Sequence, residues 1–268
     1  MQKFKQLFPV EGAILGMIHL KALPGTPAYD GNDEVIIEQA INEAILYKKA
    51  GIDGIIIENM HDTPYVRNEV GHEISSLMAV IAREVKKVSD LPCGVQVLAG
   101  ANEAAMAVAK AGGLDFVRVE GFVFAHVADE GIIESSAGTL LRYRKKIGAD
   151  DILIFTDIKK KHSAHAITAD VDVVETAKAA AFFRSDGIII TGNSTAVAAM
   201  PWDIQNAKKA AALPTLVGSG ITIDNVEHYL PISDGLIVGS YFKRDGFWAN
   251  EIEENRVVEF MEKVKGLR

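Results

Sequence analysis

The chain has 268 residues, of which 49% are hydrophobic and 24% charged, and its formal net charge is −8. This composition is typical of a globular protein with a full core, and the negative charge argues against a dedicated nucleic-acid or anionic-membrane surface. No apolar run approaches the roughly 18 residues that span a bilayer. The single cysteine, Cys93, cannot form an internal disulfide. We therefore expect a cytoplasmic protein with no membrane insertion and no nucleic-acid partner.

Eight short apolar runs alternate with helical patterns along the chain. The runs are rich in β-branched residues and apolar throughout, which is typical of parallel strands covered on both faces. We expect strands at residues 13–18, 54–58, 93–98, 116–120, 152–157, 186–191, 215–218 and 235–239. We expect helices at residues 33–50, 71–89, 102–112, 136–148, 170–183, 203–212, 223–229 and 252–265.

This strict alternation predicts one domain, residues 1–268, folded as a (β/α)8 TIM barrel. The alternative is an open, doubly wound sheet. That fold would need a Gly-x-Gly-x-x-Gly motif after the first strand, and residues 19–27 read His-Leu-Lys-Ala-Leu-Pro-Gly-Thr-Pro instead. The barrel is therefore the better prediction.

Polar residues stand where the predicted strands end, which in a barrel is the face that carries the active site. These residues are His19, Glu58, Asn59, Gln96, Arg118, Glu120, Asp157, Thr191, Ser219 and Ser240. A ring of polar side chains at one mouth is the expected lining of a small-molecule site. His19 is either a base or ligand donor, or a cap of the loop that follows it.

Arg118 and Glu120 lie two residues apart on one strand, so their side chains point the same way. They could form an ion pair inside the mouth. Alternatively, Arg118 could hold an anionic substrate while a carboxylate transfers a proton.

The loop at residues 157–162 reads Asp-Ile-Lys-Lys-Lys-His. Such a charge run could be a solvated face, but here it falls at the predicted active-site end, where positive charge would attract a phosphoester. A lysine close to other cations can also lose its proton and act as a base or nucleophile. The sequence does not choose among Lys159, Lys160 and Lys161.

Glycines end the last two predicted strands, in Gly218-Ser219-Gly220 and in Gly239-Ser240. Two such loops in succession are what a (β/α)8 barrel uses to hold a phosphate with backbone N–H groups. We expect Thr222 to cap the helix that follows. The alternative is that these glycines only make tight turns.

Two further expectations concern a lid and a metal. Residues 121–135 are long for a strand–helix connection and contain Phe122 and Phe124, so we expect a lid with an apolar underside. Carboxylates near the strand ends supply enough oxygen ligands for a divalent cation such as Mg²⁺, whereas no spacing supports zinc. The sequence predicts no other cofactor.

Taken in order, these segments resemble the BtpA/SgcQ family over nearly the whole chain. The resemblance is carried by residues 17–27, 58–59, 62–65, 94–98, 117–120, 129–133, 157–162, 217–220, 225 and 238–246. It implies a (β/α)8 barrel similar to the ribulose-phosphate-binding barrels, in a family with relatives linked to photosystem I biogenesis and to sugar phosphotransfer. Gln96 and Glu120 stand where the family often has Asn.

We interpret the chain as an enzyme, a lyase, isomerase or hydrolase, that acts on a small phosphorylated compound such as a sugar phosphate or a nucleotide-derived ester. The predicted catalytic residues are His19, Glu58, Asp157, Lys161 and His162. The predicted substrate-binding residues are Asn59, Gln96, Arg118, Glu120, Asn193, Gly218, Ser219, Gly220, Gly239 and Ser240. The alternative is a biogenesis or assembly factor that uses an idle barrel to bind a partner, which an exposed apolar patch around residues 122–124 would favour. Either protein could form a homo-oligomer.

Overall fold

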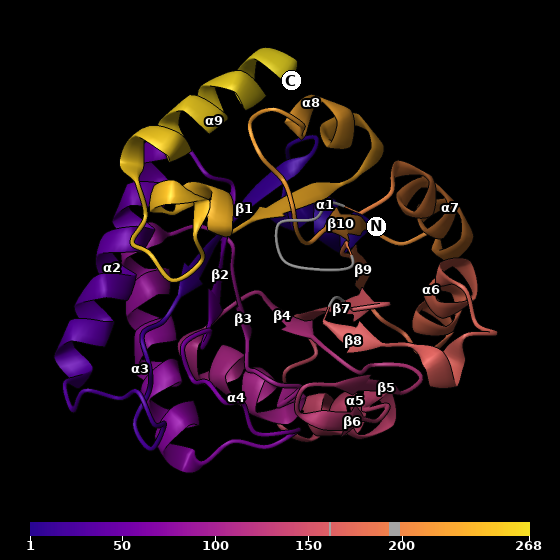
Figure 1. Cartoon of the computed structure of the whole chain (residues 1–268), viewed down its shortest axis with the longest axis horizontal. Coiled ribbons are helices and arrows are strands. Elements are labelled where there is room, and N and C mark those ends of the chain that lie inside the picture. The colour runs from indigo at the N-terminus through magenta and orange to yellow at the C-terminus, as the bar shows by residue number, and fades with distance from the viewer. Residues whose placement is uncertain (161, 193–198) are drawn as a thin grey trace.

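A computed structural model shows eight parallel strands closed into a barrel, with helices around the outside (Figure 1). It describes residues 1–160, 162–192 and 199–268. The order around the barrel is β1-β11-β10-β9-β7-β4-β3-β2. The strands are β1 (Ala13–His19), β2 (Gly54–Glu58), β3 (Cys93–Gln96), β4 (Phe116–Val119), β7 (Leu153–Ile158), β9 (Gly187–Ile190), β10 (Thr215–Val217) and β11 (Gly235–Val238). The predicted (β/α)8 barrel is confirmed.

The helices that cover the barrel follow the strands as the sequence predicts. They are α2 (Asp33–Ala50), α3 (His72–Ser89), α4 (Asn102–Gly112), α5 (Ala137–Lys146), α6 (Val173–Phe182), α7 (Pro201–Ala211), α8 (Val226–Tyr229) and α9 (Glu254–Leu267). Local signals set their ends. The Asn32 side chain accepts a hydrogen bond from the N–H of Val35 at the start of α2, and Gly51 ends this helix in the left-handed conformation. No helix in the described part of the chain is both long and apolar enough to cross a membrane.

A short first helix, α1 (Gln2–Leu7), closes the amino-terminal end of the barrel and is not predicted by the sequence pattern. Phe4 lies in this helix and Phe8 just after it, and both are buried in the cluster that fills the barrel interior. Their ring centroids lie 5.8 Å from Phe155 and 6.1 Å from Phe116, respectively. Aromatic rings therefore fill this end of the barrel.

The predicted lid segment, residues 121–135, contains two short strands rather than an irregular loop. They are β5 (His126–Ala128) and β6 (Gly131–Ile133), and β5 also pairs with β8 (Ser163–Ala164) from the connection after β7. The connections after β4 and β7 thus form one three-stranded antiparallel sheet, which lies at the lower right of Figure 1, beside β7. Phe122 is buried, while Phe124 is 39% exposed.

Candidate functional site

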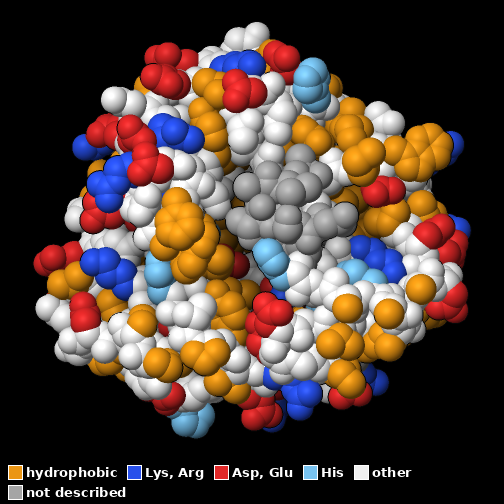
Figure 2. All heavy atoms as spheres, viewed as in Figure 1, with side chains coloured by type: hydrophobic (Ala, Val, Ile, Leu, Met, Phe, Trp, Pro, Cys, Tyr) orange, Lys and Arg blue, Asp and Glu red, His pale blue; other side chains and the backbone are white. Residues whose placement is uncertain are grey.

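A cavity of about 560 Å³ lies at the carboxyl ends of the barrel strands, within the size range of small-molecule sites. Figure 2 looks onto this end of the molecule and shows a hollow near its centre. The predicted residues that line the cavity are His19, Glu58, Gln96, Arg118, Glu120, His162, Gly218, Ser219, Gly220, Gly239 and Ser240. The barrel thus gathers most of the predicted polar residues at one mouth.

Two of the predicted catalytic and substrate-binding residues lie outside this cavity, and two lie outside the described residues. The Asn59 side chain donates to Asp62 Oδ2 at 2.8 Å and accepts from the N–H of Leu98 at 2.7 Å, so it holds the loops after β2 and β3 together. Asp157 contacts Arg118 instead of facing the cavity. Lys161 and Asn193 are the two that lie outside the described residues.

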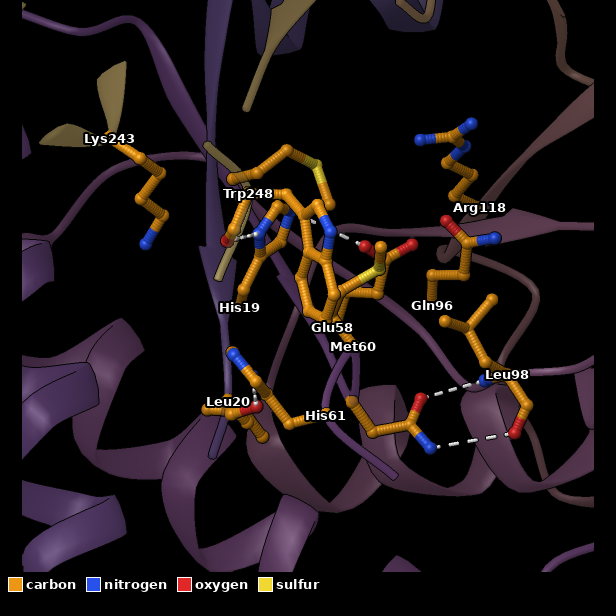
Figure 3. Close-up of polar contacts among 12 residues, drawn as sticks. His19, Leu20, Glu58, Met60, His61, Gln96, Leu98, Arg118, Lys243 and Trp248 are labelled. Atoms are coloured by element: carbon orange, nitrogen blue, oxygen red, sulfur yellow. Dashed lines mark hydrogen bonds and ion pairs between the residues drawn. The ribbon is translucent and has the colours of Figure 1, made fainter. Parts of the chain in front are cut away.

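His19 and Glu58 form a buried pair at the ends of β1 and β2, which the strand register places side by side (Figure 3). His19 Nδ1 lies 3.2 Å from the carbonyl oxygen of Trp248. Because a carbonyl only accepts, Nδ1 carries a proton. Nε2 then faces Glu58 Oε2 at 3.5 Å. A Cβ at Gly239 would lie 3.4 Å from this ring, so the glycine lets the His19 ring come close to the β11 backbone.

Arg118 pairs with Asp157 and not, as one interpretation of the sequence suggested, with Glu120. Its Nε and Nη2 donate to the two oxygens of Asp157, each at 2.8 Å. Burial alone would lower the pKa of Arg118, but the contacts with Asp157 outweigh it, so the pKa lies above its usual value. Since both Asp157 oxygens accept from the guanidinium, Asp157 holds Arg118 in place.

Glu120 organises the opposite side of the mouth. Its Oε1 accepts from Gln96 Nε2 at 2.8 Å, and its Oε2 accepts from Lys160 Nζ at 2.8 Å. Burial would lower the pKa of Lys160, but Glu120 outweighs it and raises the pKa above the usual value. Lys160 is therefore held as an ammonium ion. Of the lysine run, Lys160 lines the cavity, whereas Lys159 donates to the carbonyl of Thr168.

The glycine loops after β10 and β11 face the cavity, but not every predicted N–H is available. The N–H of Gly218 donates to the carbonyl of Ile190 at 2.8 Å and so cannot bind a ligand. Within the described ranges, the N–H groups of Gly220 and Ser240 have no hydrogen-bond acceptor. Ser240 begins the 3-10 helix η3 (Ser240–Phe242).

The predicted cap at Thr222 is wrong. Helix α8 has four residues and begins at Val226, with Asn225 as its first flanking residue. The Asn225 side chain accepts from the N–H of Thr222 at 2.9 Å and donates to the carbonyl of Gly220 at 2.8 Å. Asn225 therefore fixes the turn after β10, because its short amide side chain bonds to nearby backbone groups more readily than it continues a helix.

Several cavity residues are missed by reasoning from the strand ends, among them Met60, Tyr65, Trp248 and Arg256. The first two belong to the loop after β2, and Trp248 follows η4 (Arg244–Gly246). Arg256, in the first turn of α9, donates from Nε to the carbonyl of Tyr241 at 2.6 Å and lies 4.5 Å from the centre of the Tyr241 ring. The only sequence signal for Trp248 is an aromatic residue in a connection long enough to fold back over the mouth.

A metal site and a reactive thiol receive no support from side-chain positions. Among the residues outside the gaps at 161 and 193–198, no three His, Cys, Asp or Glu side chains are arranged to hold a metal ion. Cys93 is fully buried at the start of β3, and burial raises the pKa of its thiol to about 11.

Together these features define a parallel (β/α)8 barrel with a cavity lined by polar side chains at its carboxyl-end mouth. The BtpA family model matches residues 10–266, and the chain belongs to this family. It is 46% identical to an uncharacterised mitochondrial protein of Caenorhabditis elegans, over 95% of this chain and 94% of that protein. It is 33% identical to the photosystem I biogenesis protein BtpA of Synechocystis sp., over 96% of this chain and 89% of that protein.

Solved structures resemble the chain in fold at low sequence identity. Phosphoribosyl anthranilate isomerase from Thermus thermophilus matches with a TM-score of 0.60 and 10% identity, covering 96% of this chain and all of that one. This likeness shows the barrel fold.

Proposed function

We propose that the chain is an enzyme that acts on a small phosphorylated compound by general acid–base chemistry. The observation that carries this proposal is the composition of one cavity, which is lined both by the buried His19–Glu58 pair and by the glycine loops after β10 and β11. The His19–Glu58 pair can move a proton, and the glycine loops can bind an anion.

The anion would bind at the β10 and β11 side of the mouth. The N–H groups of Gly220 and Ser240 lack acceptors within the described ranges, and Arg256 lines the same cavity. Among the described residues, no carboxylate forms an ion pair with Arg256. By contrast, Asp157 neutralises Arg118 and Glu120 neutralises Lys160. A phosphate bound here would gain backbone hydrogen bonds and a charge-assisted contact together. The neighbour from Thermus thermophilus, whose name denotes a phosphoribosyl compound, has the same barrel fold.

Proton transfer would fall to His19 with Glu58. The bond from Nδ1 to the Trp248 carbonyl fixes the ring and directs Nε2 toward Glu58 and the cavity. Isomerisation, aldol cleavage and hydrolysis all need such a transfer. Lys160, kept as an ammonium ion by Glu120, suits stabilisation of negative charge and does not suit covalent catalysis.

The alternative of an assembly factor rests on the name of the Synechocystis relative. Of the aromatic residues that would favour it, Phe122 is buried and Phe124 is 39% exposed, with Val127 and Ile132 exposed on the neighbouring strands β5 and β6. The polar residues that the cavity gathers at the mouth favour the enzyme over the assembly factor.

The test is calorimetric titration of ribose 5-phosphate into the wild-type protein and two matched variants, Gly220→Asp and Gly220→Asn. Gly220 has a φ of +71°, which Asp and Asn both tolerate better than other side chains, so the pair differs mainly in charge. We expect Gly220→Asp to weaken binding at least tenfold and Gly220→Asn to weaken it much less. Thermal melts check that both variants are folded. Equal affinity for wild type and folded Gly220→Asp, or no binding to wild type, would rule out the phosphate site.

A further inference from the structure

A buried acceptor in the cavity, the amide oxygen of Gln96, has no donor among the described residues. Gln96 is 2% exposed, and its Nε2 donates to Glu120 Oε1 at 2.8 Å. Because a carboxylate accepts and an amide oxygen cannot donate, this bond fixes the orientation of the amide. The other amide atom, Oε1, is buried without a hydrogen-bond partner among the described residues. A buried acceptor left unpaired is costly, which points to a partner that arrives with a ligand.

Gln96 lies across the barrel from the proposed phosphate site. In the closed strand order, β3 is four strands from β10 in either direction, and both Gln96 and Gly220 line the one cavity. A ligand whose anionic group is held by the β10 and β11 loops would therefore reach Gln96 with its opposite end.

Apolar and aromatic side chains form part of the cavity wall. Met60 and Leu98 line it, together with Tyr65 and Trp248, and Figure 3 shows Met60, Leu98 and Trp248 with Gln96. The Tyr65 hydroxyl donates to the carbonyl of Met60 at 2.7 Å, so that polar group is already used. A wall of thioether, leucine and aromatic groups would desolvate sugar hydroxyls without replacing their hydrogen bonds. It suits the face of a flat ring.

A second acceptor faces the same cavity. Glu130, in the turn between β5 and β6, lines the cavity, and its Oε2 is buried without a partner in the described part of the chain. Two acceptors without donors among the described residues favour a ligand group that donates hydrogen bonds.

We propose that the substrate is nucleotide-like: a phosphate joined through a sugar-sized spacer to a planar nitrogen heterocycle, whose N–H donates to Gln96 Oε1. This inference rests on the proposed function, because the phosphate orients the ring toward Gln96. Met60 and Leu98, with the aromatic side chains, provide the surface for the ring.

The test uses calorimetric titration of ribose 5-phosphate and the four common ribonucleoside 5′-monophosphates. The proteins are wild type, Gln96→Met, which keeps side-chain length but removes the acceptor together with the donor to Glu120, and Gln205→Met, an exposed position on α7 that serves as the control. We expect at least one nucleotide to bind wild type ten or more times tighter than ribose 5-phosphate. Gln96→Met should lower the affinity for that nucleotide about tenfold, the effect of losing one hydrogen bond of about 1.4 kcal/mol. Its affinity for ribose 5-phosphate should stay within about twofold of wild type.

A ligand-side measurement removes the dependence on a folded variant. An analogue of the tightest nucleotide that lacks its ring or amino N–H donor should bind wild type about tenfold more weakly. The inference is overturned if ribose 5-phosphate binds as tightly as every nucleotide, if Gln96→Met weakens both ligands equally, or if the analogue binds like its parent. If one of these results is found but ribose 5-phosphate still binds, the proposed phosphate site remains supported. If no phosphorylated compound binds, both proposals are overturned.

Discussion

A single buried ion pair connects the loop after β11 to helix α2. Lys243, 1% exposed, donates from Nζ to the two oxygens of Glu43 at 3.2 and 3.3 Å. Glu43 also accepts from Gln39 Nε2 at 2.9 Å, and the same Nε2 donates to the carbonyl of His19 at 3.0 Å. Through these bonds Lys243 helps to hold both Ser240, three residues before it, and His19 in place.

Replacement of Lys243 tests this connection. Lys243→Met leaves the Glu43 carboxylate buried without its cation, so we expect the free energy of unfolding to fall by roughly 3–5 kcal/mol. The double variant Glu43→Gln/Lys243→Met removes the unpaired charge and should recover much of the loss. Urea denaturation followed by circular dichroism measures both. Lys145→Met, in an exposed pair with Asp150, is the control and should change stability by less than about 1 kcal/mol. Equal effects of the two single substitutions would contradict the connection.

At the scale of single residues, the sequence predicts which side chains reach the mouth but not how they pair. Arg118 lies in β4 and Glu120 directly follows it, yet Arg118 bonds to Asp157 of β7 and Glu120 bonds to Lys160, two residues after β7. The pairing depends on the register of β4 with β7, in which Arg118 lies opposite Phe155, and one sequence does not specify that register. Which lysine of the run pairs with Glu120 depends likewise on the backbone path, and Lys159, just before Lys160, has a positive φ that redirects the chain.

At the scale of elements, helix α1 gives a second test of stability. Phe8, 2% exposed, packs its ring among Phe4 and Phe116 at the closed end of the barrel. Phe8→Ala should lower the free energy of unfolding by about 3–5 kcal/mol, because it removes buried apolar area and leaves a cavity. The matched control is Phe182→Ala, since Phe182 is 83% exposed and its loss should change stability by less than about 0.5 kcal/mol. Denaturant unfolding compares the two, and similar values would mean that the Phe8 ring, just after α1, does not stabilise the closed end of the barrel.

The elements that the sequence predicts well are those with long, uniform patterns. The eight barrel strands are β-branched runs apolar on both faces, and their observed bounds differ from the predicted ones by at most two residues. Helix α1 is missed because six residues are too short for a 3.6-residue period to be recognised. Strands β5 and β6 have three residues each, too few for alternation, and α8 is shortened by the Asn225 turn.

At the scale of the whole molecule, the barrel has one end closed by aromatic rings and one end open to the cavity. The sheet of β5, β6 and β8 belongs to the open end, where Asp129 and Glu130 line the cavity with Lys160. Two connections that are distant in sequence therefore contribute side chains to the same site, and their pairing positions the acceptor of Glu130 and the ammonium of Lys160. A ligand in the cavity would contact both connections at once.

This arrangement predicts that ligand binding stabilises the sheet over the mouth. The strands β5 and β6 pair over only three residues, so few hydrogen bonds hold them and local opening should be frequent. A ligand that contacts the β5–β6 turn binds the closed form better than the open one and should slow opening. Hydrogen exchange followed by mass spectrometry, with and without a saturating concentration of the tightest-binding ribonucleoside 5′-monophosphate, should show stronger protection of residues 126–133 in the complex. Peptides from residues 2–8, at the opposite end of the barrel, serve as the internal control and should exchange equally in both samples. Equal exchange of residues 126–133 in both samples would show that this sheet is not a lid.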